Sequence, residues 1–137
     1  MQSRINAYLN FPGTAREAME FYKSIFGGTL TISTFKDYNA AQDPSDENKI
    51  MHSMLEAENG ISFMGADVPS SMGQPNSTTS LALSGDDEAE LTGYFEKLSA
   101  GGTVGQPLMK APWGDSFGMV VDKYGVEWMV NITGIRQ

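Results

Sequence analysis

The stretches that decide the fold are FYKSIFGGTL at residues 21–30 and YFEKLSAGGTV at residues 94–104, which are two versions of one segment. Each predicts an amphipathic helix that ends at a pair of glycines, because glycine accepts the backbone conformations that stop a helix. A second pair follows in the same order: GISFM at residues 60–64 and GVEWM at residues 125–129, a glycine turn leading into a strand. The chain therefore contains an internal duplication, which predicts two similar modules.

The remaining elements give each module one strand, one helix and three further strands. Thr14 and Glu17 stand three residues apart at the start of the first helix, which is the spacing of a capping box. The polar residues 37–49 predict an exposed loop. Apolar alternation and glycine turns predict first-module strands at residues 5–11, 29–35, 51–57 and 61–65, and, in the second module, a helix at 86–100 and strands at 79–84, 103–109, 116–121 and 126–132.

These elements predict one α+β domain over residues 1–137, built from two βαβββ modules. Module one takes in about residues 1–67 and module two about residues 79–137. The stretch at about 68–78 is rich in serine, glycine and proline and is predicted to be the linker.

Composition and charge narrow the classes of function. The 137 residues carry a formal net charge of -8, which disfavours binding to nucleic acid and to anionic membranes. There is no cysteine, so disulfides and thiolate chemistry are excluded. No run of 18 apolar residues occurs, and we expect a cytoplasmic protein.

The order of several motifs resembles one known family. The motifs are YLNF at residues 8–11, EAMEFY at 17–22, FGG at 26–28, His52, WGDSFG at 113–118 and DKYGVEW at 122–128. They cover nearly the whole chain and resemble the PhnB-like branch of the vicinal oxygen chelate superfamily, also called the glyoxalase/bleomycin resistance/dioxygenase superfamily. This branch often carries the label of a 3-demethylubiquinone methyltransferase.

The resemblance implies the glyoxalase/bleomycin resistance fold, in which two tandem βαβββ modules form a curved mixed sheet around a cup. It also implies that two chains associate as a homodimer. In better-known members a divalent metal in the cup polarises oxygens of the substrate. The methyltransferase label gains no support, because a methyl-donor domain needs a nucleotide-type parallel sheet.

The resemblance further implies where such a metal would bind. The histidine of the family's first strand maps onto Asn6 and, in the second module, onto about Ser80, while the glutamate of its last strand maps onto Met64 and Met129. Amide, hydroxyl and thioether groups are poor ligands for a hard cation. We therefore expect no metal cofactor.

Strand alternation indicates which side chains face the cup. In residues 126–132 the apolar residues share one side, so Glu127 and Met129 share the other. The same alternation turns Tyr8, His52 and Met64 toward the cup, and Trp113 stands in a turn before a strand. The candidate ligand-binding residues are Asn6, Tyr8, His52, Met64, Trp113, Glu127 and Met129.

Three of these residues allow more than one role. His52, the one histidine, is a structural histidine, a ligand contact or a base; Glu56 lies roughly 13 Å along the same strand, too far to orient it. Glu127 holds a metal, binds a substrate amine or lies in a dimer seam. Trp113 closes over an apolar ligand, anchors a subunit contact or packs in the core.

The sequence thus predicts a small-molecule-binding protein that lacks the usual metal centre, and it leaves open whether any reaction is catalysed. The alternative is a divalent-metal-dependent lyase, isomerase or dioxygenase that holds its metal through His52, Glu127 and water. A third alternative is a purely structural dimer with a filled cup. The expected partners are a second copy of the chain and a small molecule, with no nucleic acid and no membrane.

Overall fold

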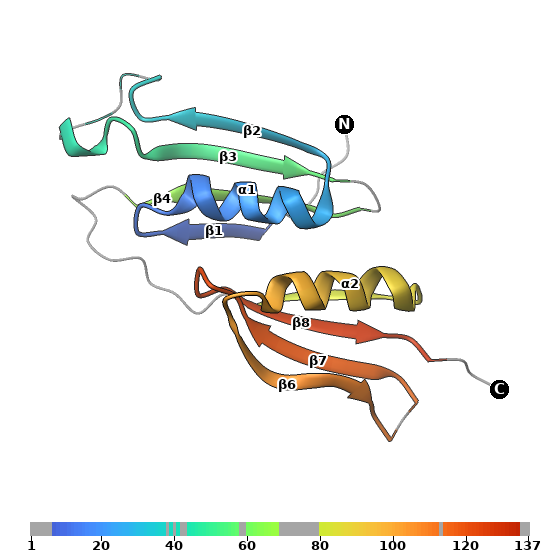
Figure 1. The fold of residues 1–137 in the computed structure, drawn as a ribbon. Coiled ribbons are helices and arrows are strands. Elements are labelled where there is room, and N and C mark those ends of the chain that lie inside the picture. Colours follow the sequence, from blue (N-terminus) through green and yellow to red (C-terminus); the bar gives the residue numbers. More distant parts are fainter. Residues whose placement is uncertain are drawn as a thin grey trace. The chain divides into compact units, whose positions relative to one another are not determined.

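The computed structural model describes residues 7–37, 39, 41, 44–57, 60–68, 80–112 and 114–134. The chain divides into two compact units, Met1–Ser77 and Thr78–Gln137. Within the described residues each unit contains four strands and one α-helix that lies against its sheet (Figure 1). The predicted linker lies, except for Val68, outside the described residues.

The observed elements repeat the order βαβββ. The first unit contains β1 (Ala7–Phe11), α1 (Ala15–Phe26), β2 (Thr29–Thr34), a 3-10 helix (Pro44–Asp46), β3 (Ile50–Glu56) and β4 (Ser62–Asp67). The second contains β5 (Ser80–Gly85), α2 (Glu88–Ser99), β6 (Thr103–Lys110), β7 (Ser116–Val121) and β8 (Glu127–Ile132). The order predicted from the sequence is confirmed.

The two sheets share one topology. The strand orders are β1-β4-β3-β2 and β5-β8-β7-β6. In each sheet the first strand pairs parallel to the last, and the other neighbours pair antiparallel. These mixed sheets, each with one helix, confirm the α+β class.

Helix α1 forms because its apolar residues recur at helical spacing. The buried residues of this helix are Ala15, Ala18, Met19, Tyr22, Ile25 and Phe26. The rings of Tyr22 and Phe26 meet the ring of Phe63 on β4 edge to face, with centroids 5.5 and 6.2 Å away. This packing covers the sheet face that carries Phe63 and builds the core of the first unit.

The double glycines stop both helices and also allow a close backbone approach. Gly28, at φ 90°, lies so near the carbonyl of Glu56 that an added Cβ would clash with it. Gly102 stands in the same relation to the carbonyl of Val121. Because Glu56 and Val121 end β3 and β7, the equivalent strands, the duplication preserves the same contact in both units.

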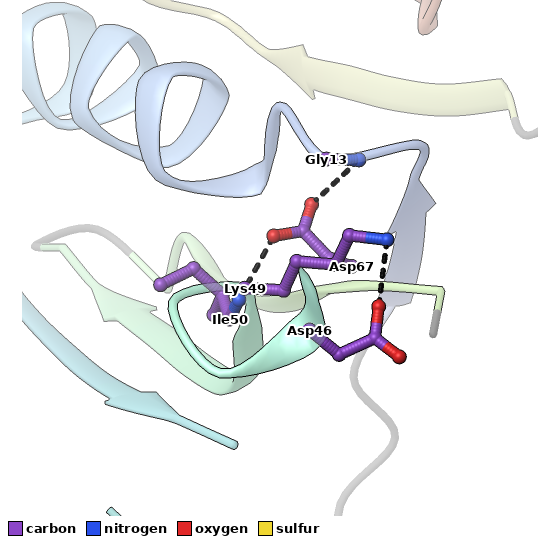
Figure 2. Close-up of polar contacts among 5 residues, drawn as sticks. All are labelled: Gly13, Asp46, Lys49, Ile50 and Asp67. Carbon is purple, nitrogen blue, oxygen red and sulfur yellow. Dashed lines mark hydrogen bonds and ion pairs between the residues drawn. The ribbon is translucent and has the colours of Figure 1, made fainter. Parts of the chain in front are cut away.

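The predicted capping box is wrong. Thr14 occupies the N-cap of α1 without a side-chain hydrogen bond. Instead the Asp67 carboxylate, at the end of β4, accepts hydrogen bonds from the backbone N–H groups of Gly13 (3.0 Å), Ala15 (2.9 Å) and Ile50 (2.8 Å). Figure 2 shows Asp67 between Gly13 and Ile50. Asp67 is only 4% exposed, so a distant buried acid replaces the local cap.

The loop predicted at residues 37–49 is also not wholly exposed. Asp46 in the 3-10 helix is 2% exposed, and its carboxylate pairs with the Lys49 ammonium at 2.9 Å (Figure 2). Ile50 follows directly and donates to Asp67. Two buried carboxylates, those of Asp46 and Asp67, therefore hold the segment before β3. Each has the polar partner that a buried charge requires: the Lys49 ammonium for Asp46 and backbone N–H groups for Asp67.

The second unit is fixed by different polar contacts. Asp87 caps α2 locally, since its carboxylate accepts a 3.0 Å hydrogen bond from the Glu90 N–H. Between β7 and β8 the buried Asp122 accepts hydrogen bonds from the Val126 N–H and from Nε1 of Trp128, the latter at 2.8 Å. Trp128 is 2% exposed, which confirms its predicted place in the core. Neither described helix combines the length and the apolar character needed to cross a membrane.

Candidate functional site

Each sheet has one face under its helix and one face without a helix, which we call the open face. In β1, Leu9 is 1% exposed on the helix side, whereas Tyr8 is 46% exposed on the open face. In β8, Trp128 is buried and its neighbours Glu127 and Met129 are half-buried on the open face. Strand alternation therefore predicted the sides of these residues correctly.

A row of paired residues crosses the open face of the first unit. Tyr8 is the register partner of Met64, Met64 of Met54, and Met54 of Thr31. Register partners project from the same face, with Cβ atoms of antiparallel pairs about 4.5–5.5 Å apart. The structure thus brings together two predicted residues, Tyr8 and Met64, and adds Met54.

The open face of the second unit carries an equivalent row. Met129 is the register partner of Ala82 and of Met119, and Met119 is the partner of Gln106. Met119 was not among the candidate residues. The internal repeat could have identified Met119, because Met119 follows Met54 by the same number of residues as Gly125 follows Gly60.

Both units therefore place a cross-strand methionine pair at the same two strand positions: Met54 with Met64, and Met119 with Met129. On the opposite side of the same strands the residues differ, since Gly65 of β4 corresponds to Val130 of β8. Methionine is flexible and polarisable, and its sulfur contacts aromatic rings favourably. The paired thioethers form an adaptable apolar surface on each open face.

His52 lies beside the methionine pair of the first unit. It projects from the open face of β3, opposite Ser33 and two residues before Met54, and it is half-buried. Glu56 lies two pleats further along the same strand, roughly 13 Å away, so it does not orient the imidazole. His52 therefore shares the open face with Met54.

Glu127 is engaged by its neighbouring strand. Its Oε1 accepts a 2.7 Å hydrogen bond from the Ser80 hydroxyl, its register partner on β5. One carboxylate oxygen is thereby held at the edge of the open face, two residues from Met129. The remaining two candidate residues, Asn6 and Trp113, lie outside the described residues.

The donor groups at the family's metal positions do not fit a hard divalent cation. Among the described positions these groups are the Ser80 hydroxyl and the thioethers of Met64 and Met129. Thioether sulfur is a soft, uncharged donor, whereas hard cations such as Mg²⁺ and Mn²⁺ prefer carboxylate, carbonyl and water oxygens. Within the described part of the chain, no three His, Cys, Asp or Glu residues gather closely enough to hold a metal ion.

Two βαβββ units with these mixed sheets define a protein of the glyoxalase/bleomycin resistance fold. A solved domain of the glyoxalase/bleomycin resistance/dioxygenase class from Frankia sp. EAN1pec shares this fold at 11% identity, with a TM-score of 0.65 over 97% of this chain and 98% of that one. More specifically, residues 3–131 match the family model described as 3-demethylubiquinone-9 3-methyltransferase, and the chain belongs to this PhnB-like family.

Two solved structures are more similar in sequence. Protein PA1353 from Pseudomonas aeruginosa is 34% identical, with a TM-score of 0.80 over 96% of this chain and 98% of that one. A PhnB protein from Bacillus cereus, described as a putative 3-demethylubiquinone-9 3-methyltransferase, is 29% identical, with a TM-score of 0.71 over 96% and 100%. Both likenesses extend over 96% of the chain.

Proposed function

We propose that this protein binds a small apolar or aromatic molecule against the methionine pairs of its open faces, without the metal centre of better-known superfamily members. The observation that carries the proposal is the recurrence of the pairs Met54–Met64 and Met119–Met129 at equivalent positions in both units. A residue kept twice on the face without a helix, while Gly65 and Val130 differ on the helix side, is better explained by ligand contact than by core packing.

The neighbouring side chains support this assignment. Around the thioethers stand hydrogen-bonding groups that would orient a ligand: His52, Gln106, the Ser80–Glu127 pair and Asn131. Small-molecule sites combine an apolar surface with a few polar groups in this way. The sulfur–aromatic contact adds about 0.3–1.5 kcal/mol for each ring contact, so an aromatic ligand gains most.

The methyl transfer named in the family's description is not part of this proposal. Each described sheet has four strands with a single parallel pair, whereas a nucleotide-type methyl-donor domain uses a largely parallel sheet. A fold and a family label do not by themselves give an activity, which belongs to the residues of a site. We further propose that the protein is a homodimer and that it is located in the cytoplasm. We also propose that its partners do not include nucleic acid, which the net charge of -8 supports.

The decisive experiment examines protein taken directly from cells. Native mass spectrometry should detect a bound organic molecule, and replacement of a pair, M54Q with M64Q or M119Q with M129Q, should release it. The matched variants carry leucine at the same positions, which retains apolar contact and should retain most of the ligand. Binding that is indifferent to both glutamine pairs would contradict the proposal.

Metal analysis separates the proposal from the metal-dependent enzyme. We expect purified protein to contain less than stoichiometric zinc, nickel, manganese or iron, because the described donors at the family's metal positions are a hydroxyl and two thioethers. Stoichiometric metal that is lost in His52→Ala or Glu127→Ala would establish the alternative and overturn the metal-free proposal.

A further inference from the structure

A separate hollow lies on the helix side of the second unit, between α2 and β6. Its volume is about 620 Å³, within the range of small-molecule sites. Phe95 and Leu108 line it, and an added Cβ on Gly118 would contact both, so they sit on the helix-covered face of the sheet. This groove, which we call the α2–β6 groove, is therefore distinct from the open face.

One α2 residue of the groove differs from its counterpart in α1. Helices α1 and α2 have 12 residues each, and in a position-by-position comparison Met19 of α1 corresponds to Thr92 of α2. Met19 packs its sulfur against Gly65 and is fully buried. In the second unit the larger Val130 stands at the position of Gly65, and Thr92 lines the groove. The second unit thus carries a short polar side chain at the groove where the first unit carries a buried thioether.

The apolar lining of the groove is partly exposed. Val104, the register partner of the buried Val120, borders the groove and is 42% exposed. Phe95 and Leu108 line the groove from α2 and from β6. These three residues offer a surface for an apolar side chain of a ligand.

Polar residues stand at one end of the groove, and Thr92 and Glu96 line it elsewhere. An adjoining cavity of about 400 Å³ shares Glu88, Lys110, Ser116 and Ile132 with the groove, so these four residues stand where the two cavities meet. Within the described part of the chain, neither the Glu88 carboxylate nor the Lys110 ammonium forms an ion pair. The ion pair found there joins Asp46 to Lys49. A carboxylate, an ammonium and a hydroxyl thus stand together beside an apolar hollow.

We propose that the α2–β6 groove binds an α-amino acid with a large apolar side chain. The ligand ammonium pairs with Glu88, and the ligand carboxylate accepts from Lys110 and Ser116. The apolar side chain extends over Phe95 and Leu108. An α-amino acid carries an ammonium and a carboxylate on one carbon atom, and these match the opposite charges of Glu88 and Lys110. A simple amine or a simple acid would pair with only one of the two residues. This inference does not rest on the proposed function of the open faces.

The test is calorimetric titration of the full chain with L-phenylalanine, phenethylamine and 3-phenylpropionate. We expect one saturable site per chain for L-phenylalanine and at least about tenfold weaker binding of each analogue, since each leaves a charged group of the site unpaired. E88Q and K110M should each weaken L-phenylalanine about tenfold. K97M and E47Q, which change charge outside the groove, should leave the affinity unchanged.

Filling the groove provides an independent test. Thr92→Met installs the side chain of the other repeat, and because Val130 occupies the space that Gly65 leaves in the first unit, the longer chain enters the groove. We expect this variant to abolish binding and Thr92→Ser to preserve it. A thermal melt checks that both variants fold. If Thr92→Met does not fold, the loss of L-phenylalanine binding in K110M tests the groove instead.

Three results would overturn the inference. They are the absence of saturable binding by L-phenylalanine, binding of an analogue as tight as that of L-phenylalanine, and unchanged binding in Thr92→Met. Sedimentation velocity supplies a fourth, because a Val104→Asp variant that converts a dimer into a monomer would show that a second copy of the chain covers the groove.

Discussion

Asp67 and Ala15 lie 52 positions apart in the sequence, yet the Asp67 carboxylate accepts a 2.9 Å hydrogen bond from the Ala15 N–H at the start of α1. The same carboxylate accepts from Gly13 and Ile50. One buried side chain therefore ties the end of β4 to the first helix and to the start of β3. This contact makes the first helix dependent on completion of the sheet.

Replacing Asp67 should destabilise the protein strongly. Asp67→Ala leaves three backbone N–H groups without their acceptor in a buried place, and we expect a loss of about 3–5 kcal/mol in the free energy of unfolding. Urea denaturation followed by circular dichroism measures it. Asp86→Ala is the matched control at an exposed acid and should change stability by less than about 0.5 kcal/mol. A loss below about 1 kcal/mol in Asp67→Ala would contradict the assigned role.

The two helix N-caps should respond differently to alanine. Thr14 makes no side-chain cap hydrogen bond, so Thr14→Ala should alter stability by no more than about 0.5 kcal/mol. Asp87 accepts from the Glu90 N–H, so Asp87→Ala should cost about 1 kcal/mol. Equal costs for the two substitutions in the same urea titration would refute the distinction.

This contrast shows which features of the fold can be predicted from residues that are close in the sequence. The helices, their glycine stops and the faces of the strands follow from residues near one another, and these were predicted correctly. The cap of α1 was not, because Thr14 and Glu17 have the right spacing and nothing local indicates that Asp67 takes their place. A contact across 52 residues becomes visible only when β4 lies beside β1.

The candidate site divides in the same way. Tyr8 and Met64 are adjacent in register, which alternation alone could not predict because it gives a face and not a neighbour. Met119 could have been found by extending the repeat from Met64 and Met129 back to Met54. The α2–β6 groove could not be predicted, because residues of α2 and β6 that are separated in the sequence line it together.

The glycines of the helix ends provide a sharp test of packing. Gly28→Ala should cost more than about 2 kcal/mol, because its φ is 90° and the new Cβ would meet the Glu56 carbonyl. Gly93 within α2 has open space around it, so Gly93→Ala should stabilise the protein by about 0.5–1 kcal/mol. Thermal melts of both variants check the opposite signs, and a neutral Gly28→Ala would argue against the close approach.

The turn after β2 should respond to acid. The Thr34 N–H donates to the Asp37 carboxylate at 2.8 Å, and this hydrogen bond, followed by that of the Thr34 side chain to the same carboxylate, lowers the pKa of Asp37 below its ordinary value. Because the pKa is lowered in the folded state, the unfolded state binds the proton more readily. The contribution of Asp37 to stability is therefore present above the ordinary carboxyl pKa and is lost as the pH falls through the lowered pKa of the folded state. NMR titration of the Asp37 carboxyl should give a midpoint below that of Asp37 in Thr34→Val. Equal midpoints would exclude the Thr34 side chain as a cause.

Methionines of the helix side and of the open face should separate stability from binding. Met19 is fully buried under α1, so Met19→Ala should cost about 2–5 kcal/mol through the cavity it leaves. Met64 is half-buried on the open face, so Met64→Ala should cost less than about 1.5 kcal/mol, while the ligand retained from cells is lost. Urea titration and native mass spectrometry on the same samples measure the two effects. If Met64→Ala destabilises the fold as much as Met19→Ala does, the open-face methionines serve packing, and the recurrence of the pairs in both units no longer supports a binding site.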